Sequence, residues 1–543
     1  MTAHVNEDAR TVGEVLRLRA SDVPGRTFLV CDDERLTYRE TFEASGRLAK
    51  ELIAAGAGRG THVGLLMPNG AGFVLGALAA ARIGAVAVPM STMSTAAELH
   101  TLVDGSDTAL LLAAPSYRSK DFRALLAEAI GLDTDRPPPL PSTAAPNLRR
   151  VFFLGETAGA GEDGAGLPRA GEAVGDDLLA AVEADVAPSD DLVIVHTSGS
   201  TSAPKGVVHT HGALLDHLRV LNAMRDYGPD EVLFSNSPFF WIGGFSYTLL
   251  GTLLAGATLV CSRAAEPSKV LDVIERERPT MVNGYASSVA ALAADPSYPR
   301  RDLSSIRRGN LYPIMPESAR PADPGLRPNM LGITEGGSVV LADDHDEDLP
   351  EGRRGSFGRP VPGYQARIVD PESGADLPPG EKGELWLRGP ALMRGYLGVE
   401  RFDAFDEDGW FHTGDAARTD EDGHWYFLGR GDDLIKTSGA SVSPAEVQDA
   451  ILTATGLSSY VLGLPDADRG QIVAAVLVVG GADGEESAEG PPPDAAGLRA
   501  ALAPVLSPYK IPRAVRAVPV DEVPLRSSGK VDMSALEELF GDR

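Results

Sequence analysis

The ten residues Thr197–Gly206, TSGSTSAPKG, constrain this chain most, because they directly follow the apolar run Leu192–Val195. A strand that ends in a loop of small, hydroxyl-bearing residues presents N–H groups, hydroxyls and one lysine to a polyphosphate. The spacing differs from a Walker loop, since Lys205 lies between a proline and a glycine and no Ser or Thr follows it. Clusters of Ser, Thr and Gly are also typical of solvated turns, so the loop needs support from other segments.

Length and cysteine content indicate a large, enzyme-sized protein with reduced thiols. With 543 residues and 43% apolar content, the chain is long enough for two or more domains. Its two cysteines, Cys31 and Cys261, are too few for a disulfide framework or a cysteine-based zinc site, which favours a reducing compartment such as the cytoplasm. We expect no signal peptide, because the sequence MTAHVNEDAR has no basic region leading into an apolar core. We expect no membrane span, because the most apolar stretch, Ala71–Ala81, is shorter than the ~20 residues required.

The charge balance argues against nucleic acid as a partner. The chain has 77 acidic and 49 basic residues, a net charge of −28. Such a charge repels nucleic acid and anionic lipid. An anionic ligand must therefore be bound by local cations.

The apolar pattern predicts an α/β fold. Residues Thr61–Leu112 alternate short apolar runs with one helix-like stretch, as a strand, helix and strand would. After Gly355, short strands at close spacing predict a small β-rich subdomain. These strands are expected at Gln365–Val369, Gly383–Arg388 and Gly423–Leu428.

Polar and glycine-rich segments mark loops and one domain boundary. Surface loops or insertions are expected at Gly155–Gly175, Asp343–Arg354 and Gly480–Gly497. The charged, glycine-flanked turn Gly429–Asp433 predicts a boundary between domains 1–431 and 432–543. The second domain is expected to be α+β and to end in a helix from Met533.

Several separated motifs, in order, resemble those of the AMP-forming acyl-CoA ligases and related adenylating enzymes. They are the loop at 197–206, Gly332–Glu335, Trp410–Asp415, the segment around Gly439 and Ser527–Lys530. The resemblance covers nearly the whole chain. It implies a large N-terminal domain of stacked α/β subdomains with a small β-rich subdomain, and a smaller, mobile α+β C-terminal domain.

The resemblance also implies a nucleotide site. The residues expected on the nucleotide are Thr197, Ser198, Gly199, Ser200, Thr201, Thr334, Asp415 and Arg430, with Lys205 on phosphate. Asp415 and Arg430 would bind the ribose, and Thr201 and Glu335 would hold Mg²⁺ as hard oxygen ligands.

The C-terminal motifs imply two catalytic arrangements. Asp432 falls on the family's hinge, where one residue absorbs the rotation of the small domain. Lys530 would stabilise charge on the carboxylate and the α-phosphate during adenylation. The segment with Lys436, Ser438 and Gly439 would face CoA in the second arrangement.

The implied chemistry has two halves. A carboxylate attacks the α-phosphorus of ATP to give an acyl-adenylate and pyrophosphate, and a thiol, normally that of CoA, then displaces AMP. The expected ligands are therefore a carboxylic acid, ATP or acyl-AMP, Mg²⁺ and CoA.

The sequence departs from the family pattern mainly in the adenylation half. Arg308–Pro313 replaces a segment of small residues, and Leu331 replaces an aromatic residue that stacks on adenine. Ser202 stands at a common glycine position, and Trp241 at a common histidine position. Adenylation is therefore expected to be weak.

Three alternatives follow. The chain could thioesterify an acyl-AMP supplied by a separate adenylating enzyme, or be an acyl-AMP ligase that loads a separate carrier protein. A module that only senses acyl-AMP is a non-enzymatic alternative, against which the retained Asp432 and Lys530 argue.

The acyl pocket is expected to suit a bulky aliphatic or polycyclic acid. Its predicted residues are Trp241, Gly243, Gly244, Phe245, Gly284 and Tyr312. Aromatic side chains on buried segments are also frequent in cores. The sequence leaves the acyl group and the oligomeric state open, with a homodimer as one alternative.

Overall fold

The structure of the protein is a computed structural model, which describes residues 9–131, 142–154, 169–197, 204–284, 289–343, 347–430, 434–479, 492–519, 522–524 and 531–541. The chain divides into two compact units. Unit 1 consists of Met1–Thr92, Val103–His196 and Gly206–Gly429, and unit 2 of Met93–Leu102, Thr197–Lys205 and Arg430–Arg543. The predicted domain boundary between residues 431 and 432 stays a prediction.

The first large sheet of unit 1 has six strands in the order β14-β13-β11-β12-β1-β2. They are β1 (Thr27–Cys31), β2 (Glu34–Thr37), β11 (Val232–Ser235), β12 (Thr258–Cys261), β13 (Met281–Asn283) and β14 (Arg308–Gly309). All neighbouring strands pair in parallel except β2, which pairs antiparallel with β1 at the edge. Nearly continuous apolar strands of this kind are buried on both faces.

The second large sheet has seven strands in the order β20-β10-β9-β4-β3-β5-β8. They are β3 (His62–Leu66), β4 (Val86–Pro89), β5 (Leu110–Ala113), β8 (Arg150–Phe153), β9 (Asp191–Thr197), β10 (Lys205–Thr210) and β20 (Gly395–Tyr396). The apolar run before the phosphate loop thus forms the predicted strand, as β9. Strand β20 pairs antiparallel with β10.

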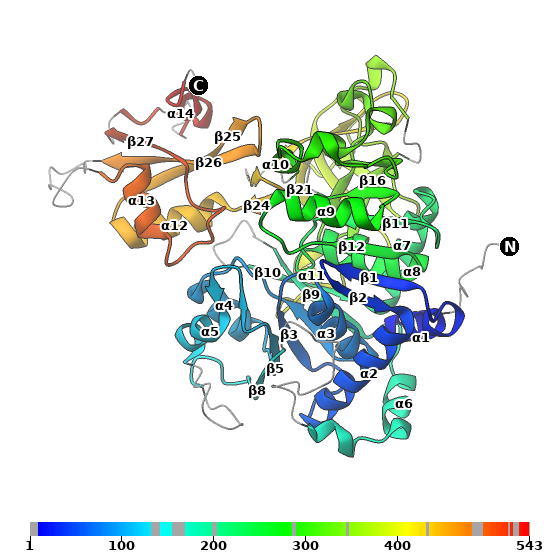
Figure 1. The fold of residues 1–543 in the computed structure, drawn as a ribbon. Helices are drawn as coiled ribbons and strands as arrows, with labels where there is room; N and C mark the ends of the chain where they lie inside the picture. Colours follow the sequence, from blue (N-terminus) through cyan, green and yellow to red (C-terminus); the bar gives the residue numbers. More distant parts are fainter. Residues whose placement is uncertain are drawn as a thin grey trace. The chain divides into compact units, whose positions relative to one another are not determined.

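Helices link and cover these sheets. They are α1 (Val12–Asp22), α2 (Tyr38–Ala54), α3 (Ala71–Arg82), α4 (Ala96–Gly105), α5 (Phe122–Ile130), α6 (Asp176–Ala184), α7 (His211–Met224), α8 (Gly251–Ala255), α9 (Pro267–Glu277), α10 (Ala290–Ala293) and α11 (Arg401–Ala404). Helix α3 packs against β3 and β4 of one sheet and β2 of the other (Figure 1). Its buried side chains are apolar all round, as a helix enclosed on every side requires.

Two smaller sheets complete unit 1. One contains β15 (Leu331–Ile333), β16 (Ser338–Ala342) and β17 (Arg359–Pro360). The other contains β18 (Gln365–Val369), β19 (Gly383–Arg388), β21 (Phe411–Thr419) and β22 (Trp425–Arg430). A two-stranded ribbon, β6 (Ser116–Tyr117) and β7 (Lys120–Asp121), lies outside these sheets.

Unit 2 contains a sheet with helices on both faces. Its elements are β23 (Ile435–Thr437), β24 (Ala440–Val442), α12 (Pro444–Thr455), β25 (Ser459–Asp466), β26 (Gly470–Val479), α13 (Ala495–Leu502), β27 (Ala514–Pro519) and α14 (Met533–Glu538). Along β26, Val473 and Ala475 pack with α12 and α13, whereas Ile472 and Ala474 pack with α14. Figure 1 shows α14 on the opposite side of β26 from α12 and α13. This period of two buries both faces of the sheet.

The sequence-based elements are largely confirmed. The strand, helix and strand predicted within Thr61–Leu112 are β3, α3 and β4, and the predicted strands at 365–369 and 383–388 have the predicted bounds. The third predicted strand was placed two residues early, because a turn closed by Gly423 N–H on the Asp420 carbonyl precedes β22.

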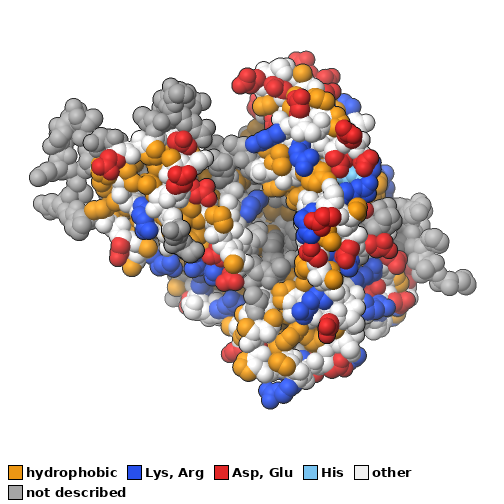
Figure 2. Space-filling model, turned by 90° about the horizontal axis from the view of Figure 1, so that it is seen from above, with side chains coloured by type: hydrophobic (Ala, Val, Ile, Leu, Met, Phe, Trp, Pro, Cys, Tyr) orange, Lys and Arg blue, Asp and Glu red, His pale blue; other side chains and the backbone are white. Residues whose placement is uncertain are grey.

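The predicted loops are wrong at two ends. Residues 495–497 begin α13, because Asp494 caps that helix, and 169–173 form a 3₁₀ turn. None of the described helices is long and apolar enough to cross a membrane. On the face drawn in Figure 2, acidic and basic side chains are interspersed.

Candidate active site

A tight turn between β15 and β16 presents Glu335. The two strands pair antiparallel, and Gly337 N–H donates to the Thr334 carbonyl at 2.9 Å. Gly337 has φ of +68°, a conformation that strongly favours glycine. The predicted motif residues Thr334 and Glu335 therefore lie in a loop of fixed shape.

Four hydrogen bonds from other elements hold this turn. His209 Nε2 lies 2.7 Å from the Thr334 carbonyl, and Met393 N–H donates to the Glu335 carbonyl at 2.7 Å. The hydroxyl of Tyr396 donates to Glu335 Oε1 at 2.8 Å. The hydroxyl of Tyr364 donates to the Gly336 carbonyl at 2.7 Å. Sequence reasoning missed all four partners, since none belongs to a motif that it used.

Glu335 is a buried carboxylate that has no cationic side chain beside it within the described part of the chain. Glu335 is 7% exposed, and its carboxylate accepts a hydrogen bond from the neutral Tyr396 hydroxyl. No cluster of three or more metal-ligating side chains occurs among the described residues. The buried carboxylate of Glu335 fits Mg²⁺, which takes one or two carboxylates together with substrate phosphates.

Two buried histidines, His209 and His217, support the segment around this turn. Burial lowers the pKa of His196, His209, His211 and His217 to about 4. His209 is therefore neutral at pH 7, and its bond to a carbonyl requires the proton on Nε2. His217 meets the ring of Tyr364 edge-on, with the centroids 5.3 Å apart.

A bulge aims Asp415. Between β19 and β21 the register shifts, so that Glu384 opposes Ala416 while Trp386 opposes His412. The extra residues Thr413–Asp415 leave the ladder, and the Asp415 N–H bonds the Thr413 hydroxyl at 3.0 Å. Such bulges re-aim side chains. Asp415 is buried, with 4% exposure, and its role on ribose stays a prediction.

The predicted acyl residues fall into two groups. Trp241 is half-buried against Phe240 at the start of the π-helical segment Gly243–Leu250, a geometry frequent at functional sites. Phe245 is instead fully buried against the ring of Phe73. The space beside Gly244 is filled by the Pro238 carbonyl, so this glycine serves chain packing.

The segment that departs from the family pattern is built into the core. The Asn310 side chain accepts from Gly284 N–H at 3.0 Å and donates to its carbonyl at 2.9 Å. Leu311 is fully buried in the core formed with α9 and α10, and half-buried Tyr312 packs against that core. The bulk of Leu311 therefore lies in the core, which removes part of the crowding expected from the sequence. Leu331 is also buried.

In unit 2, the predicted CoA segment is a tight hairpin. Thr437 pairs with Ala440, and the two loop residues Ser438 and Gly439 have φ of +50° and +84°. Positive φ at both positions is typical of a type I′ turn. Lys436 is exposed, and its Nζ bonds the Ser441 hydroxyl at 2.6 Å.

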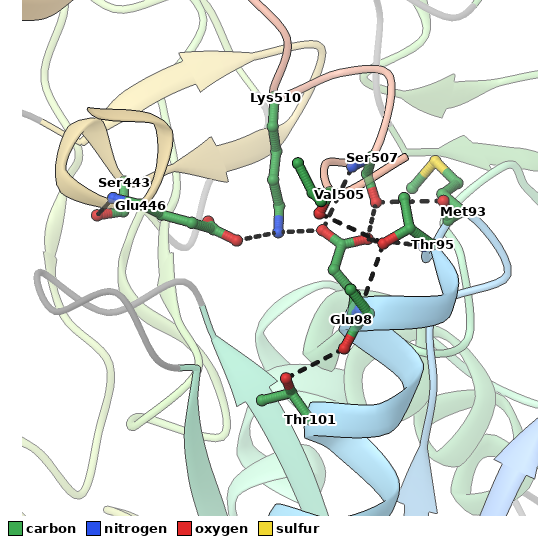
Figure 3. A network of polar contacts seen from close by, with 10 residues as sticks. Met93, Thr95, Glu98, Thr101, Ser443, Glu446, Val505, Ser507 and Lys510 are labelled. Carbon is green, nitrogen blue, oxygen red and sulfur yellow. Dashed lines mark hydrogen bonds and ion pairs between the residues drawn. The ribbon is translucent and has the colours of Figure 1, made fainter. Parts of the chain in front are cut away.

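Unit 2 also holds a buried ionic centre that the sequence analysis did not identify. Lys510 Nζ lies 2.7 Å from Glu98 Oε1 and 2.7 Å from Glu446 Oε1 (Figure 3). Ser507 donates to the other Glu98 oxygen at 2.7 Å. The three charged residues lie far apart in the sequence, so no local pattern links them.

The pKa values in this centre differ between the carboxylates. Burial opposes charge on Glu98, but Lys510 and the hydroxyl of Ser507 lower its pKa. Burial raises the pKa of Glu446 more than Lys510 lowers it. Burial also opposes charge on Lys510, and the surrounding Tyr509 and the two carboxylates outweigh it and raise the pKa.

Several predicted residues lie outside the described residues. They are Ser198, Gly199, Ser200, Thr201, Ser202, Asp432 and Lys530. Thr197 ends β9, Lys205 begins β10, and the backbone of Arg430 ends β22.

Comparison with protein families identifies the class. Residues 16–397 match the family described as AMP-binding enzyme, and residues 446–530 match the AMP-binding enzyme C-terminal domain. The chain therefore belongs to the AMP-binding enzyme family.

Relatives and solved structures agree with this class. Feruloyl-CoA synthase of Amycolatopsis sp is 32% identical over 532 residues, which are 96% of this chain and 98% of that protein. The 3-[(3aS,4S,7aS)-7a-methyl-1,5-dioxo-octahydro-1H-inden-4-yl]propanoyl:CoA ligase of Mycobacterium tuberculosis is 30% identical, covering 98% and 99% of the two chains. The structure of amide bond synthetase McbA from Marinactinospora thermotolerans matches with a TM-score of 0.74 and 26% identity, covering 97% and 100%.

The main sequence-based predictions are thus confirmed. The protein is an AMP-forming acyl-CoA ligase that acts through an acyl-AMP, with ATP and CoA as ligands. Its fold has a large N-terminal domain and a small C-terminal domain with mixed α/β structure.

Proposed function

We propose that this ligase activates a ring-bearing carboxylic acid, either aromatic or fused alicyclic, and joins it to CoA. The named acyl groups of two relatives carry a ring, feruloyl in one and an octahydroindenyl propanoyl group in the other. Trp241 lies half-buried just before the π-helical segment, and its flat ring supports a flat or bulky acyl group as the ligand.

Glu335 is the residue on which the proposed nucleotide site rests. A buried carboxylate without a cationic partner in the described structure favours a bound cation. Glu335, with Thr201 outside the described residues, would hold Mg²⁺ on the phosphates of ATP. When bound, the ion neutralises phosphate charge.

The remaining roles follow the motif assignments. Asp415 would accept hydrogen bonds from the ribose hydroxyls, and Arg430 would contact ribose or phosphate. Lys530 would stabilise the charge that develops as the carboxylate oxygen attacks the α-phosphorus and pyrophosphate leaves. In the second half, the CoA sulfur would attack the acyl carbonyl and AMP would leave, and Lys436, Ser438 and Gly439 would bind CoA.

We infer that the chain catalyses both halves. The main support is that Leu311, one of the bulky residues expected to crowd the adenylation site, packs in the core. Slow adenylation is the second candidate, favoured by Leu331, which gives adenine no aromatic face. A supplied acyl-AMP from a partner enzyme would then be the substrate.

We further propose a cytoplasmic location. Cys31 and Cys261 are register partners on β1 and β12 and are both free thiols, which supports a reducing compartment.

The acyl proposal is tested by kcat/KM for CoA thioester formation with three acids of similar size. These are a cinnamic acid, a fused alicyclic propanoic acid and a straight-chain fatty acid. We expect kcat/KM to be higher for at least one of the ring acids than for the straight-chain acid. A preference for the straight-chain acid contradicts the proposal.

A further inference from the structure

We propose that Tyr396 is a positioning residue, which orients the Glu335 carboxylate for the divalent cation of the nucleotide. The inference rests on the proposed function of Glu335 as a Mg²⁺ ligand. The single contact that carries it is the hydrogen bond of 2.8 Å from the Tyr396 hydroxyl to Glu335 Oε1.

The backbone of Tyr396 is anchored at the strand that also carries His209. On β20, Tyr396 pairs with Val207 of β10. Leu397 N–H donates to the Gly206 carbonyl at 2.7 Å, and Arg394 N–H donates to the Val208 carbonyl at 2.8 Å. The phenol therefore projects from a segment held on both sides of the residue.

The same segment also binds the backbone of Glu335. Met393 N–H donates to the Glu335 carbonyl at 2.7 Å. Residues three apart on one short segment thus bind the main chain and the side chain of Glu335. A glutamate side chain has rotatable bonds that a cation alone must freeze, whereas the phenol holds it before the cation arrives.

The chemistry of the phenol suits this task. A neutral hydroxyl orients Oε1 without cancelling the charge of the carboxylate, so Oε2 remains available as an anionic ligand. A lysine in the same place would compete with the cation for the charge. Partners that hydrogen-bond a ligating carboxylate in this way typically change metal affinity by 10–100-fold when removed.

Tyr364 provides a matched control in the same turn. Its hydroxyl donates at 2.7 Å to the Gly336 carbonyl, which is backbone, and not to the carboxylate. Replacing either tyrosine by phenylalanine removes one hydroxyl and one hydrogen bond to this turn. Only the Tyr396 bond ends on the side chain of Glu335.

The test measures binding of the Mn²⁺–ATP complex to the protein, without acid or CoA, from the change in the electron paramagnetic resonance spectrum of Mn²⁺–ATP on titration with protein, against a blank without protein. The proteins are wild type, Tyr396→Phe, Tyr364→Phe, Glu335→Gln and the double variant with both Tyr396→Phe and Glu335→Gln. We expect Tyr396→Phe to weaken Mn²⁺ binding by about tenfold. Tyr364→Phe should bind like wild type, and the double variant no worse than Glu335→Gln.

The outcomes separate the two proposals. If Glu335→Gln weakens binding and Tyr396→Phe does not, Glu335 keeps its role and the positioning inference is wrong. Equal losses in both tyrosine variants, or a further loss in the double variant, also overturn it, because the phenol would then stabilise the turn and not the carboxylate. If Glu335→Gln binds Mn²⁺ like wild type, the proposed metal role itself fails.

Discussion

Two buried carboxylate sites, one in each unit, differ in what surrounds the negative charge. In unit 1, Glu335 receives a hydrogen bond from a neutral phenol, and no cation pairs with it among the described residues. In unit 2, Glu98 and Glu446 share the buried ammonium of Lys510, at 2.7 Å each. We propose that an external cation completes the first site, whereas the second carries its own.

A buried carboxylate of a binding site differs from one of a structural ion pair in the source of the compensating positive charge. Transfer of a carboxylate out of water costs several kcal/mol, so a buried one requires compensation. Where a lysine supplies the compensation, no ligand is needed. Where only oriented hydroxyl and N–H groups surround the carboxylate, a ligand is the remaining source of positive charge.

The largest expected effect is at Glu335. Glu335→Gln keeps the shape of the side chain and removes its charge, so pyrophosphate release should fall by at least about 100-fold, the upper range for a metal-site partner. The melting temperature without ligands should not decrease, because the substitution removes a buried negative charge that has no cationic partner among the described residues. Wild-type pyrophosphate release in this variant would show that the two carboxylate sites do not differ as argued.

The corresponding change in unit 2 should affect stability. Lys510→Met leaves Glu98 and Glu446 buried without their cation, and such losses typically cost about 3–5 kcal/mol. Urea denaturation followed by a probe in unit 2 measures this. Lys436→Met is the control, because Lys436 is exposed and its removal should have little effect.

The buried histidines predict that the stability of unit 1 depends on pH. The pKa of His209 is lowered by burial to about 4, below the unfolded value of about 6.5, so the unfolded chain binds more protons between these values. The contribution of His209 to the free energy of unfolding is therefore complete above about pH 6.5 and falls as the pH is lowered towards 4. At about 1.4 kcal/mol per pKa unit, His209 contributes up to about 3 kcal/mol.

The variant His209→Gln isolates this contribution. Glutamine can donate to the Thr334 carbonyl but does not titrate, so the loss of stability between pH 6.5 and 4 should be smaller than in wild type. The measurement is the free energy of unfolding across this range. Identical slopes in both proteins would mean that His209 is not neutral in the fold.

A smaller effect is expected at Asp415. Asp415→Ala should weaken binding of an acyl-adenylate by about 1.5–3 kcal/mol, the range for hydrogen bonds to a charged group. Calorimetric titration with a non-hydrolysable acyl-AMP analogue measures it. Asp408→Ala, at an exposed carboxylate, is the control. Unchanged affinity of the Asp415 variant would remove Asp415 from the ribose site.

The sequence predicted the fold best where motif order and local periodicity agree. The strand, helix and strand at β3, α3 and β4 follow from apolar spacing, whereas the hairpin around Gly439 was not predicted and is seen only in the structure. Local motifs also predicted Thr334, Glu335 and Asp415 as candidate site residues.

The contacts that give these residues their chemistry could not be predicted, because they join distant segments. Tyr396 bonds a residue 61 positions away, and Lys510 bonds Glu98 across 412 positions. Size alone also misled: Leu311 replaces a small residue, but whether a larger side chain enters a pocket or a core depends on tertiary packing. It enters the core.

Whether the chain catalyses both halves is decided by following the two half-reactions in one vessel with this protein alone. Pyrophosphate and CoA thioester would be measured together from ATP, Mg²⁺, CoA and the preferred ring acid. If the chain catalyses both halves, the two products form in equal amounts and both disappear when the divalent cation is chelated. Thioester formed only from a supplied acyl-adenylate, with no pyrophosphate from ATP and the free acid, would contradict it.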